Sequence, residues 1–155
     1  MNKACSVATD AGITVREVTW ESHGGDIRRL RRDVFVREQQ VSEAEEWDDY
    51  DAVSRYVIAV DGRGRALGTG RLAPQGKIER LAVQRDCRGR GIGTALLRTL
   101  LDMAATQGYR RVYLHAQCRA LDFYARQGFT AEGPEFDEAG ITHRKMTLNL
   151  PRQSR

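Results

Sequence analysis

A strand-like run leads directly into a glycine-rich segment that opens the most regular helix of this sequence. Residues 88–93 are Arg-Gly-Arg-Gly-Ile-Gly, and leucines and alanines then repeat at helical spacing over Gly91–Gln107 until Gly108 ends the helix. Glycines let backbone N–H groups approach an anion closely, and a helix N-terminus carries roughly half a positive charge. Arg88 and Arg90 can add charge-assisted hydrogen bonds. The segment therefore predicts a cradle for a phosphate group.

The bulk composition predicts a globular protein. The chain has 155 residues, 41% of them hydrophobic and 30% charged, so we expect one domain over residues 1–155, with a core from about 13 to 149 and loose ends. The formal net charge of +4 suits an anionic ligand without requiring nucleic acid. The cysteines form no Cys-x-x-Cys pair, and no apolar run approaches the ~20 residues of a membrane helix. A reduced, cytoplasmic location away from membranes is therefore expected.

Hydrophobic periodicity divides the chain into strands and helices. Helices are expected over Asp26–Gln39, with Asp26 as N-cap, over Gly91–Gln107 and over Ala120–Gln127. The turn at residues 61–64 predicts a hairpin. The order of the elements predicts a central mixed sheet flanked by helices, an α/β fold with α+β character. The expected strands are Ile13–Trp20, Val53–Val60, Ala66–Leu72, Lys77–Val83, Arg111–His115, Phe129–Glu132 and His143–Leu148.

Two common phosphate-binding motifs do not match the glycine-rich segment. A P-loop needs a lysine after its last glycine, and no lysine follows these glycines. A dinucleotide fingerprint needs Gly-x-Gly-x-x-Gly, but Thr94 or Leu96 stands where the third glycine is required. Nucleotide hydrolysis and dinucleotide redox chemistry are thereby excluded.

A third family matches in two places. The pattern Arg88-x-x-Gly91-x-Gly93, after the strand that ends at Val83, resembles the acyl-CoA signature of the GCN5-related N-acetyltransferases, the GNAT superfamily. A second signature of that family resembles Gln117-x-x-Ala120-x-x-x-Tyr124-x-x-x-Gly128-Phe129. The flanks at residues 34–48 and 136–146 resemble the ElaA-like subgroup, so the resemblance covers about residues 13 to 149.

This resemblance implies a GNAT-like acyl-CoA N-acyltransferase fold. It implies direct transfer of an acetyl group from acetyl-CoA, the co-substrate, to a primary amine of a small molecule. A homodimer stays open, because dimers are frequent in the family. The alternative on the same fold is a non-catalytic acyl-CoA binder or sensor. By resemblance, phosphates lie at the turn and pantetheine lies beside the preceding strand, which makes the cofactor residues Leu81, Ala82, Val83, Arg88, Gly89, Arg90, Gly91, Ile92, Gly93, Thr94, Gln117, Ala120 and Phe123.

A nucleic-acid-binding module is disfavoured. Such a module would use the arginines of residues 28–32, but aromatic residues do not interleave with them. A metal site is not expected either. His115 and Cys118 are close in sequence, but no further ligands follow at suitable spacing.

Tyr124 is the candidate general acid. A neutral tyrosine, with a reference pKa of about 10, can deliver a proton to a nascent thiolate. The competing interpretation is core packing on a helix stripe with Phe123.

Glu79 is the candidate general base. Strand alternation predicts that Glu79 and Leu81 share one face while Ile78 and Arg80 share the other. A carboxylate in a partly desolvated cleft gains a raised pKa and can take the proton of an amine through a water molecule. A salt bridge to Arg80 or to an arginine of another strand is the competing interpretation. A water relay without a dedicated base is also open.

The acceptor site is expected around the first helix and the end of the chain. An acidic run, with Glu43, Glu45, Glu46, Asp48, Asp49 and Asp51, either attracts a cationic amine or is a surface that is solvated or paired with the arginines of the preceding helix. The solvated or paired interpretation is favoured. The candidate acceptor-site residues are Phe35, Glu38, Trp47, His115 and His143.

Overall fold

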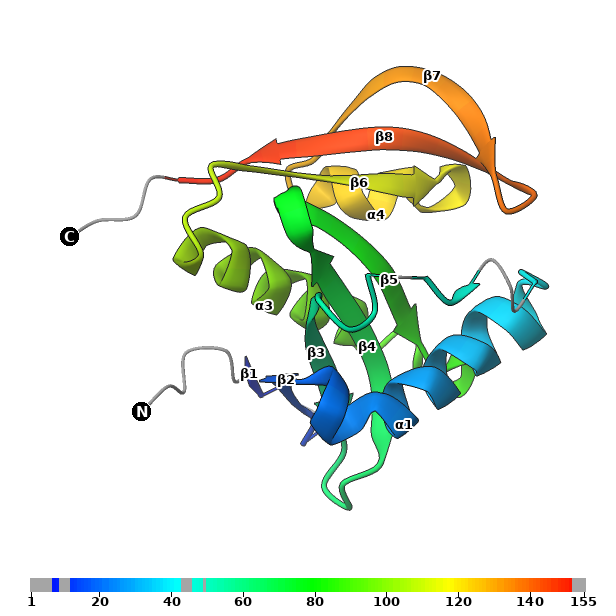
Figure 1. Ribbon diagram of the computed structural model, residues 1–155, viewed down its shortest axis with the longest axis vertical. Coiled ribbons are helices and arrows are strands. Elements are labelled where there is room, and N and C mark those ends of the chain that lie inside the picture. Colours follow the sequence, from blue (N-terminus) through cyan, green and yellow to red (C-terminus); the bar gives the residue numbers. More distant parts are fainter. Residues whose placement is uncertain (1–6, 9–11, 43–45, 49, 152–155) are drawn as a thin grey trace.

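The computed structural model describes residues 7–8, 12–42, 46–48 and 50–151 and confirms a mixed sheet flanked by helices (Figure 1). The strands are β1 (Val7–Ala8), β2 (Thr14–Val18), β3 (Arg55–Val60), β4 (Ala66–Ala73), β5 (Lys77–Val83), β6 (Arg111–Gln117), β7 (Thr130–Glu138) and β8 (Ile141–Asn149). They form one sheet in the order β1-β2-β3-β4-β5-β6-β8-β7, with β5 and β6 parallel.

Helices cover both faces of the first half of this sheet. The main helices are α1 (Trp20–Arg31), its π-helical continuation η1 (Arg32–Glu38), α3 (Ile92–Thr106) and α4 (Leu121–Arg126). Short 3₁₀ turns are η2 (Pro74–Gly76), η3 (Arg85–Cys87) and η4 (Cys118–Ala120). Successive residues of β3 face opposite layers, since Val57 packs in the cluster of Leu96 on α3, whereas Ile58 packs in the cluster of Ile27 on α1. No helix in the described ranges is long and apolar enough to cross a membrane.

The first helix begins earlier than Asp26, which is a correction to its predicted start. Thr19 is the N-cap, because its hydroxyl accepts from the backbone N–H of Ser22 while the Ser22 hydroxyl accepts from the N–H of Thr19. The helix is kinked at His23, whose φ is −132°. Gly24 follows the kink, and its lack of a side chain lets the ring of Trp20 pack against the helix, with Trp20 Cδ2 3.8 Å from the position that a Cβ on Gly24 would take.

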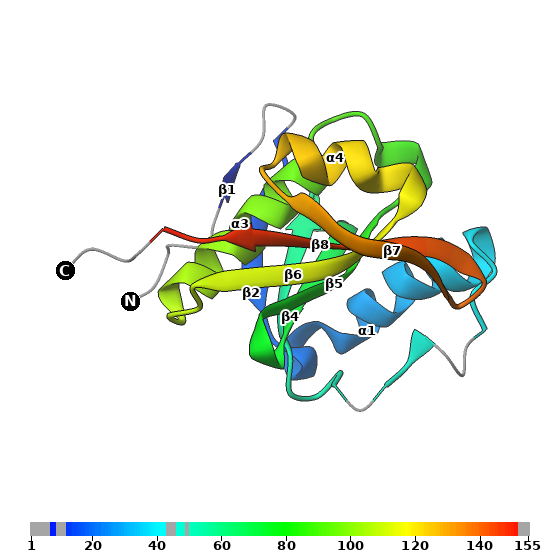
Figure 2. The same ribbon diagram turned by 90° about the horizontal axis from the view of Figure 1, so that it is seen from above.

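The sheet splits between β5 and β6. These two strands pair at one register position, Lys77 with Tyr113, and then diverge (Figures 1 and 2). Beyond that point β5 stays with β4, while β6 pairs with β8 from Arg111 to Gln117. The divergence leaves one edge of β5 facing an open space.

A bulge in β5 changes which side chains share a face. The register with β4 shifts next to Arg71, and Arg80 has a φ of +56°. Glu79 and Arg80 therefore both contact the polar groups around Asp48 and Arg71, whereas Leu81 packs with the α3 layer. The predicted pairing of Glu79 with Leu81 on one face is wrong, because an extra residue interrupts strand alternation.

The C-terminal hairpin is longer than predicted. Its strands β7 and β8 run past the expected limits and meet at Ala139 and Gly140, whose φ values are +53° and +79°. A register shift between Glu132 and Phe136 accommodates Gly133 and Pro134 within β7. The two ends of the chain were expected to be loose. Within them, Val7–Ala8 forms the short strand β1, which pairs with β2, and Gly12 and Pro151 belong to no helix or strand. The other residues of the two ends lie outside the described residues.

Candidate functional site

A cleft of about 890 Å³ occupies the gap between the diverging strands β5 and β6. Its walls come from η1, β5, the start of α3, the end of β6, α4 and the β7–β8 turn. The cleft is continuous from the glycine-rich segment to Phe35, His115 and His143. Segments distant in the sequence therefore meet around one cavity.

The start of α3 forms an open cradle at one end of this cleft. Gly91 is its N-cap in the left-handed conformation, with a φ of +79°, and no side chain caps the helix. The first-turn N–H groups thus lack a capping side chain. A Cβ built on Gly89 or Gly91 meets nothing within 4 Å, whereas one on Gly93 lies 3.6 Å from the ring of Phe123. A strained turn with open space in front fits an anionic group such as a pyrophosphate.

The predicted cradle residues divide into those that line the cleft and those that do not. Arg88, Gly89, Gly91, Gly93 and Thr94 line it. Two others do not line it. Ile92 is buried in the core and anchors the first turn of α3, and Arg90 is exposed.

Arg88 is engaged by the protein itself. Its Nη1 and Nη2 donate to both carboxylate oxygens of Glu38 at 2.7 and 2.8 Å, and its Nη2 and Nε donate to the Val83 carbonyl at 2.9 and 3.1 Å. The hydrogen bond from Arg88 lowers the pKa of Glu38. Glu38, predicted at the acceptor, instead lies against the cradle and outside the lining of the cleft. The neighbouring Gln39 accepts from Gln117 Nε2 at 2.8 Å, which links η1 to the end of β6.

The other cofactor residues follow the walls of the cleft. Leu81, Ala82 and Val83 line it on the β5 edge that does not pair with β6. Such an edge matches the strand-like amides of pantetheine. Gln117, Ala120 and Phe123 line the opposite wall.

Tyr124 lines the cleft from α4. Its ring packs edge-on against Phe123 and Phe129, with centroids 5.0 and 5.9 Å apart. No hydrogen bond joins its hydroxyl to another residue in the described part of the chain, and burial raises its pKa to about 12. Tyr124 is thus both a packing residue, as the competing interpretation expected, and a neutral phenol at the cleft.

Glu79 is held by cations, which contradicts the raised pKa expected for a base. Its Oε1 accepts from Arg71 at 2.7 Å, and its Oε2 lies 3.1 Å from Lys77 Nζ. Burial pushes the pKa of Glu79 upward, but the charge of Arg71, helped by Lys77, outweighs burial, so the net pKa is lowered. The predicted salt bridge to an arginine of another strand is confirmed, and that arginine is Arg71.

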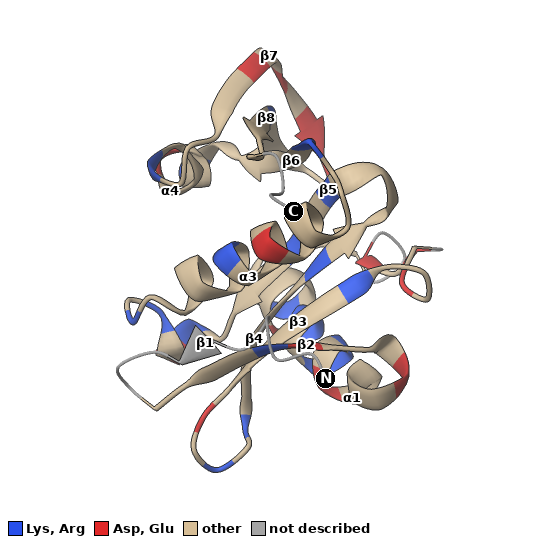
Figure 3. Cartoon of the chain, turned by 90° about the vertical axis from the view of Figure 1, so that its left-hand side faces the viewer, with Lys and Arg blue, Asp and Glu red and all other residues tan. Residues whose placement is uncertain are grey.

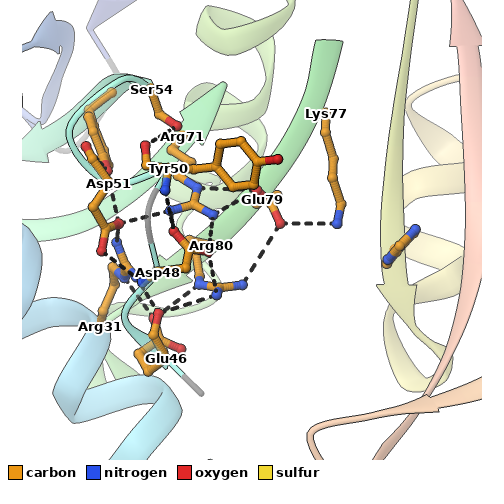
Figure 4. A network of polar contacts seen from close by, with 12 residues as sticks. Arg31, Glu46, Asp48, Tyr50, Asp51, Ser54, Arg71, Lys77, Glu79 and Arg80 are labelled. Carbon is orange, nitrogen blue, oxygen red and sulfur yellow. Dashed lines mark hydrogen bonds and ion pairs between the residues drawn. The ribbon is translucent and has the colours of Figure 1, made fainter. Parts of the chain in front are cut away.

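A buried ionic network lies behind Glu79 (Figure 4). Arg31 donates to Glu46 and Asp51 at 2.6 Å each, and Arg71 donates to Asp51 at 2.8 Å and Asp48 at 2.7 Å. The acids of the loop that the structure describes therefore pair with arginines, as the favoured interpretation expected. Glu43, Glu45 and Asp49 lie outside the described residues.

Sequence reasoning missed Arg71. The signal that could have revealed it is a single arginine in β4, a strand whose other residues are apolar or small.

Trp47 is not an acceptor wall, which corrects its predicted role. Its ring stacks under the guanidinium of Arg31, whose Cζ lies 4.9 Å from the ring centroid, and it does not line the cleft. The burial of Arg31 also removes one arginine from the basic run considered for nucleic acid. Figure 3 shows basic and acidic residues interspersed over the elements in that view, without one uniformly basic face.

Aromatic rings and a carboxylate lie together around His115 and His143, two of the predicted acceptor-site residues. His115 packs edge-on against Phe136 at 5.0 Å between centroids, and Phe136 stacks on His143 at 6.0 Å. Glu138 Oε1 lies 2.9 Å from His115 Nδ1, and both residues line the cleft with Phe35 and His143. Sequence reasoning missed Glu138, because its partner is on another strand. No group of three or more potential metal ligands occurs among the residues that the structure describes.

Known proteins of similar sequence support one family. The model of the Acetyltransferase (GNAT) domain matches residues 26–150. The uncharacterized protein YyaT of Bacillus subtilis is 32% identical over 145 residues, which cover 90% of this chain and 98% of YyaT. The uncharacterized N-acetyltransferase YjcF of the same organism is 35% identical over 121 residues, which cover 76% of this chain and 86% of YjcF.

Solved structures show the same fold. An acyl-CoA N-acyltransferase from Pseudomonas aeruginosa has a TM-score of 0.73 and 28% identity, covering 87% of this chain and 97% of that one. ElaA of Escherichia coli has a TM-score of 0.77 at 23% identity, covering 91% of this chain and 99% of ElaA. With the split sheet, the glycine cradle and the matched domain model, the chain belongs to the GNAT family of acetyltransferases.

Proposed function

We propose that this protein transfers an acetyl group from acetyl-CoA directly to a primary amine of a small molecule. The observation that carries the proposal is the continuity of one cleft, which joins the left-handed cap at Gly91 to Tyr124 and then to His115 and Glu138. A cradle suited to phosphates, a free strand edge and a group of aromatic and acidic side chains therefore line one cavity, which supports the proposed reaction. Family membership supports the acyl-CoA chemistry.

Different segments of the cleft wall would hold the different parts of acetyl-CoA. The first-turn N–H groups of α3 would bind the pyrophosphate, and the free edge of β5 at Leu81–Val83 would pair with pantetheine amides. When bound, acetyl-CoA supplies an activated thioester. An N–H of the same edge can polarise the thioester carbonyl as negative charge develops on its oxygen.

Tyr124 is the proposed proton donor to the leaving sulfur. Its raised pKa of about 12 keeps the phenol protonated throughout the usable pH range. An ordinary thiol has a pKa near 8.5, so complete transfer to a free thiolate is uphill by roughly 5 kcal/mol. The hydroxyl therefore acts by hydrogen bonding to the sulfur while the carbon–sulfur bond breaks, and the proton moves as the charge develops.

The reaction is tested with acetyl-CoA and a panel of spermidine, D-glucosamine, L-lysine and tyramine, following release of free thiol. Tyr124→Phe should lower kcat on the best amine about 100-fold, within the usual range for a general acid, and leave the Kd for CoA within twofold. Full activity of this variant would remove Tyr124 as the donor. CoA binding without turnover of any amine would favour the alternative, a non-catalytic acyl-CoA binder or sensor.

The cradle is tested separately. Gly91→Val introduces a β-branched side chain at a φ of +79°, in the space open to a ligand, and should weaken CoA binding at least tenfold. Gly64→Val is the matched control, since Gly64 has a φ of +81°, its Cβ also meets nothing within 4 Å, and it does not line the cleft. Equal CoA affinities for the two variants would refute the cradle.

A further inference from the structure

The proposed reaction needs a group that removes a proton from the acceptor. A primary alkylamine is mostly protonated near neutral pH, because its pKa is close to that of lysine, about 10.4. An ammonium nitrogen has no lone pair with which to attack a thioester. Glu79 is poorly suited to this task, since Arg71 and Lys77 occupy both of its carboxylate oxygens and lower its pKa. The acceptor end of the cleft holds another candidate.

His115 and Glu138 form a pair that faces this end. His115 belongs to β6, two positions beyond Tyr113, the residue at which β6 separates from β5. Its Nδ1 lies 2.9 Å from Glu138 Oε1, and the ring is held edge-on against Phe136 with centroids 5.0 Å apart. The His115 side chain is 26% exposed and lines the cleft, so one edge of the ring reaches the cavity.

The hydrogen bond to Glu138 determines what the imidazole can do. An ionised carboxylate only accepts, so His115 Nδ1 carries the hydrogen and donates it. In the neutral ring Nε2 then has the free lone pair, and no hydrogen bond occupies Nε2 within the part of the chain that the structure describes. Resting on the proposed acetyl transfer, we infer that His115 is the general base for the acceptor amine and that Glu138 is its positioning residue.

The proton balance is complete with groups already named. The ammonium gives one proton to His115 Nε2, and the resulting imidazolium passes it to solvent. The neutral amine then attacks the thioester carbon, forming the carbon–nitrogen bond and moving the carbonyl pair onto oxygen. Collapse of this intermediate breaks the carbon–sulfur bond and Tyr124 supplies a proton to sulfur, and the second amine proton passes through water to the Tyr124 oxygen and restores the phenol. The products are the amide, free CoA and one proton.

Two charged residues of neighbouring strands lie close to the His115 ring. Glu138 approaches from β7, and Lys145 stands opposite His115 on β8. Lys145 Nζ lies over the ring of Tyr113 at 5.1 Å from its centroid, and Glu132 lies 3.8 Å from it.

The second histidine that lines the cleft, His143, has a different hydrogen-bond partner from His115. Its Nδ1 donates to the Ile141 carbonyl at 2.7 Å, and the residue is 6% exposed. No carboxylate orients its ring among the described residues.

Kinetics test the base directly. The probe is whichever of spermidine, D-glucosamine, L-lysine and tyramine the wild type acetylates fastest. His115→Gln should lower kcat/KM for that amine about 100-fold at pH 7. His23→Gln, on α1 and outside the cleft lining, is the matched control and should match the wild type. A loss below threefold overturns the assignment.

The tautomer provides a test that does not depend on the amine. In ¹⁵N NMR of the wild type above pH 8, His115 should be protonated at Nδ1, and Glu138→Ala should move the hydrogen largely to Nε2 while lowering kcat/KM about tenfold. CoA affinity and the melting temperature should stay unchanged in both variants. Protonation at Nε2 in the wild type overturns the pair even where no amine is acetylated, whereas an absence of turnover with the Nδ1 tautomer present contradicts only the proposed function.

Discussion

Replacing Arg71 with methionine should destabilise the protein strongly. The Arg71 side chain is fully buried and donates to Asp48, Asp51 and Glu79, whose side chains are 30%, 11% and 12% exposed. Methionine fills part of the volume but leaves these carboxylates without their shared cation. Breaking a buried ion pair on one side costs about 3–5 kcal/mol. For a chain of this size that corresponds to a fall in melting temperature of about 6–20 °C.

The cost should depend on pH in a defined direction. Burial raises the pKa of Asp48 and of Glu79, but hydrogen bonding and charge from Arg71 outweigh burial, so both are lowered. A lowered carboxyl pKa contributes stability that is present above the unfolded pKa of about 4 and is lost as the pH falls through the folded value. The difference between wild type and Arg71→Met should therefore be largest near pH 7 and shrink below about pH 4.

Urea unfolding at pH 7, 5 and 3, with a thermal scan at each pH, measures this difference. Arg98→Met on the exposed face of α3 is the control and should change the free energy of unfolding by less than about 0.5 kcal/mol. A loss below about 1 kcal/mol for Arg71→Met at pH 7, or a loss that is the same at pH 7 and pH 3, would refute the reasoning.

Two further changes test contacts around the cleft. Glu38→Gln removes the carboxylate that holds Arg88, and because this pair is 41% and 28% exposed it is worth at most about 1 kcal/mol, so CoA should bind up to about fivefold tighter by calorimetry. Weaker binding would show that Arg88 needs Glu38 to face the phosphates. Gly68→Ala places a Cβ 2.9 Å from Leu96 Cδ1 and 3.0 Å from the Ala82 carbonyl oxygen, and should cost about 1–3 kcal/mol in urea unfolding. Gly62→Ala, whose Cβ meets nothing within 4 Å, is its control, and equal midpoints would contradict the close packing of β4 against α3.

Local sequence signals were sufficient to predict the helix and the strand that flank the glycine cradle. The helix predicted over Gly91–Gln107 is α3 at Ile92–Thr106, and the strand predicted over Lys77–Val83 is β5 with the same limits. Helical spacing of apolar residues and flanking glycines act within a few residues, so their pattern is visible in the sequence. The predicted start of α1 was wrong, although the Thr19–Ser22 capping box that marks the true start is local in the sequence.

Contacts between segments that are distant in the chain could not be predicted from the sequence. Arg31 and Arg71 are 40 positions apart, yet both donate to Asp51. For Glu79 the sequence left a free base and a salt bridge both open, because it does not show which arginine of another strand lies beside the carboxylate; the fold places Arg71 there. The bulge at Arg80 had the same effect, since it reverses the faces of the residues after it without a glycine or proline to mark it.

The sequence by itself predicted a phosphate-bearing ligand, because a phosphate cradle needs glycines and a helix start that are adjacent in the chain. It also predicted the candidate donor Tyr124, through a motif that runs from Gln117 to Phe129. The tertiary structure decided which ionisable groups are free to react. Arg71, 8 positions from Glu79 and 23 from Asp48, and Arg31, 20 positions from Asp51, neutralise these carboxylates, while β6 and β7 bring His115 to Glu138. Free energies of charged groups depend on distance and burial in space, and these quantities exist only once the chain is folded.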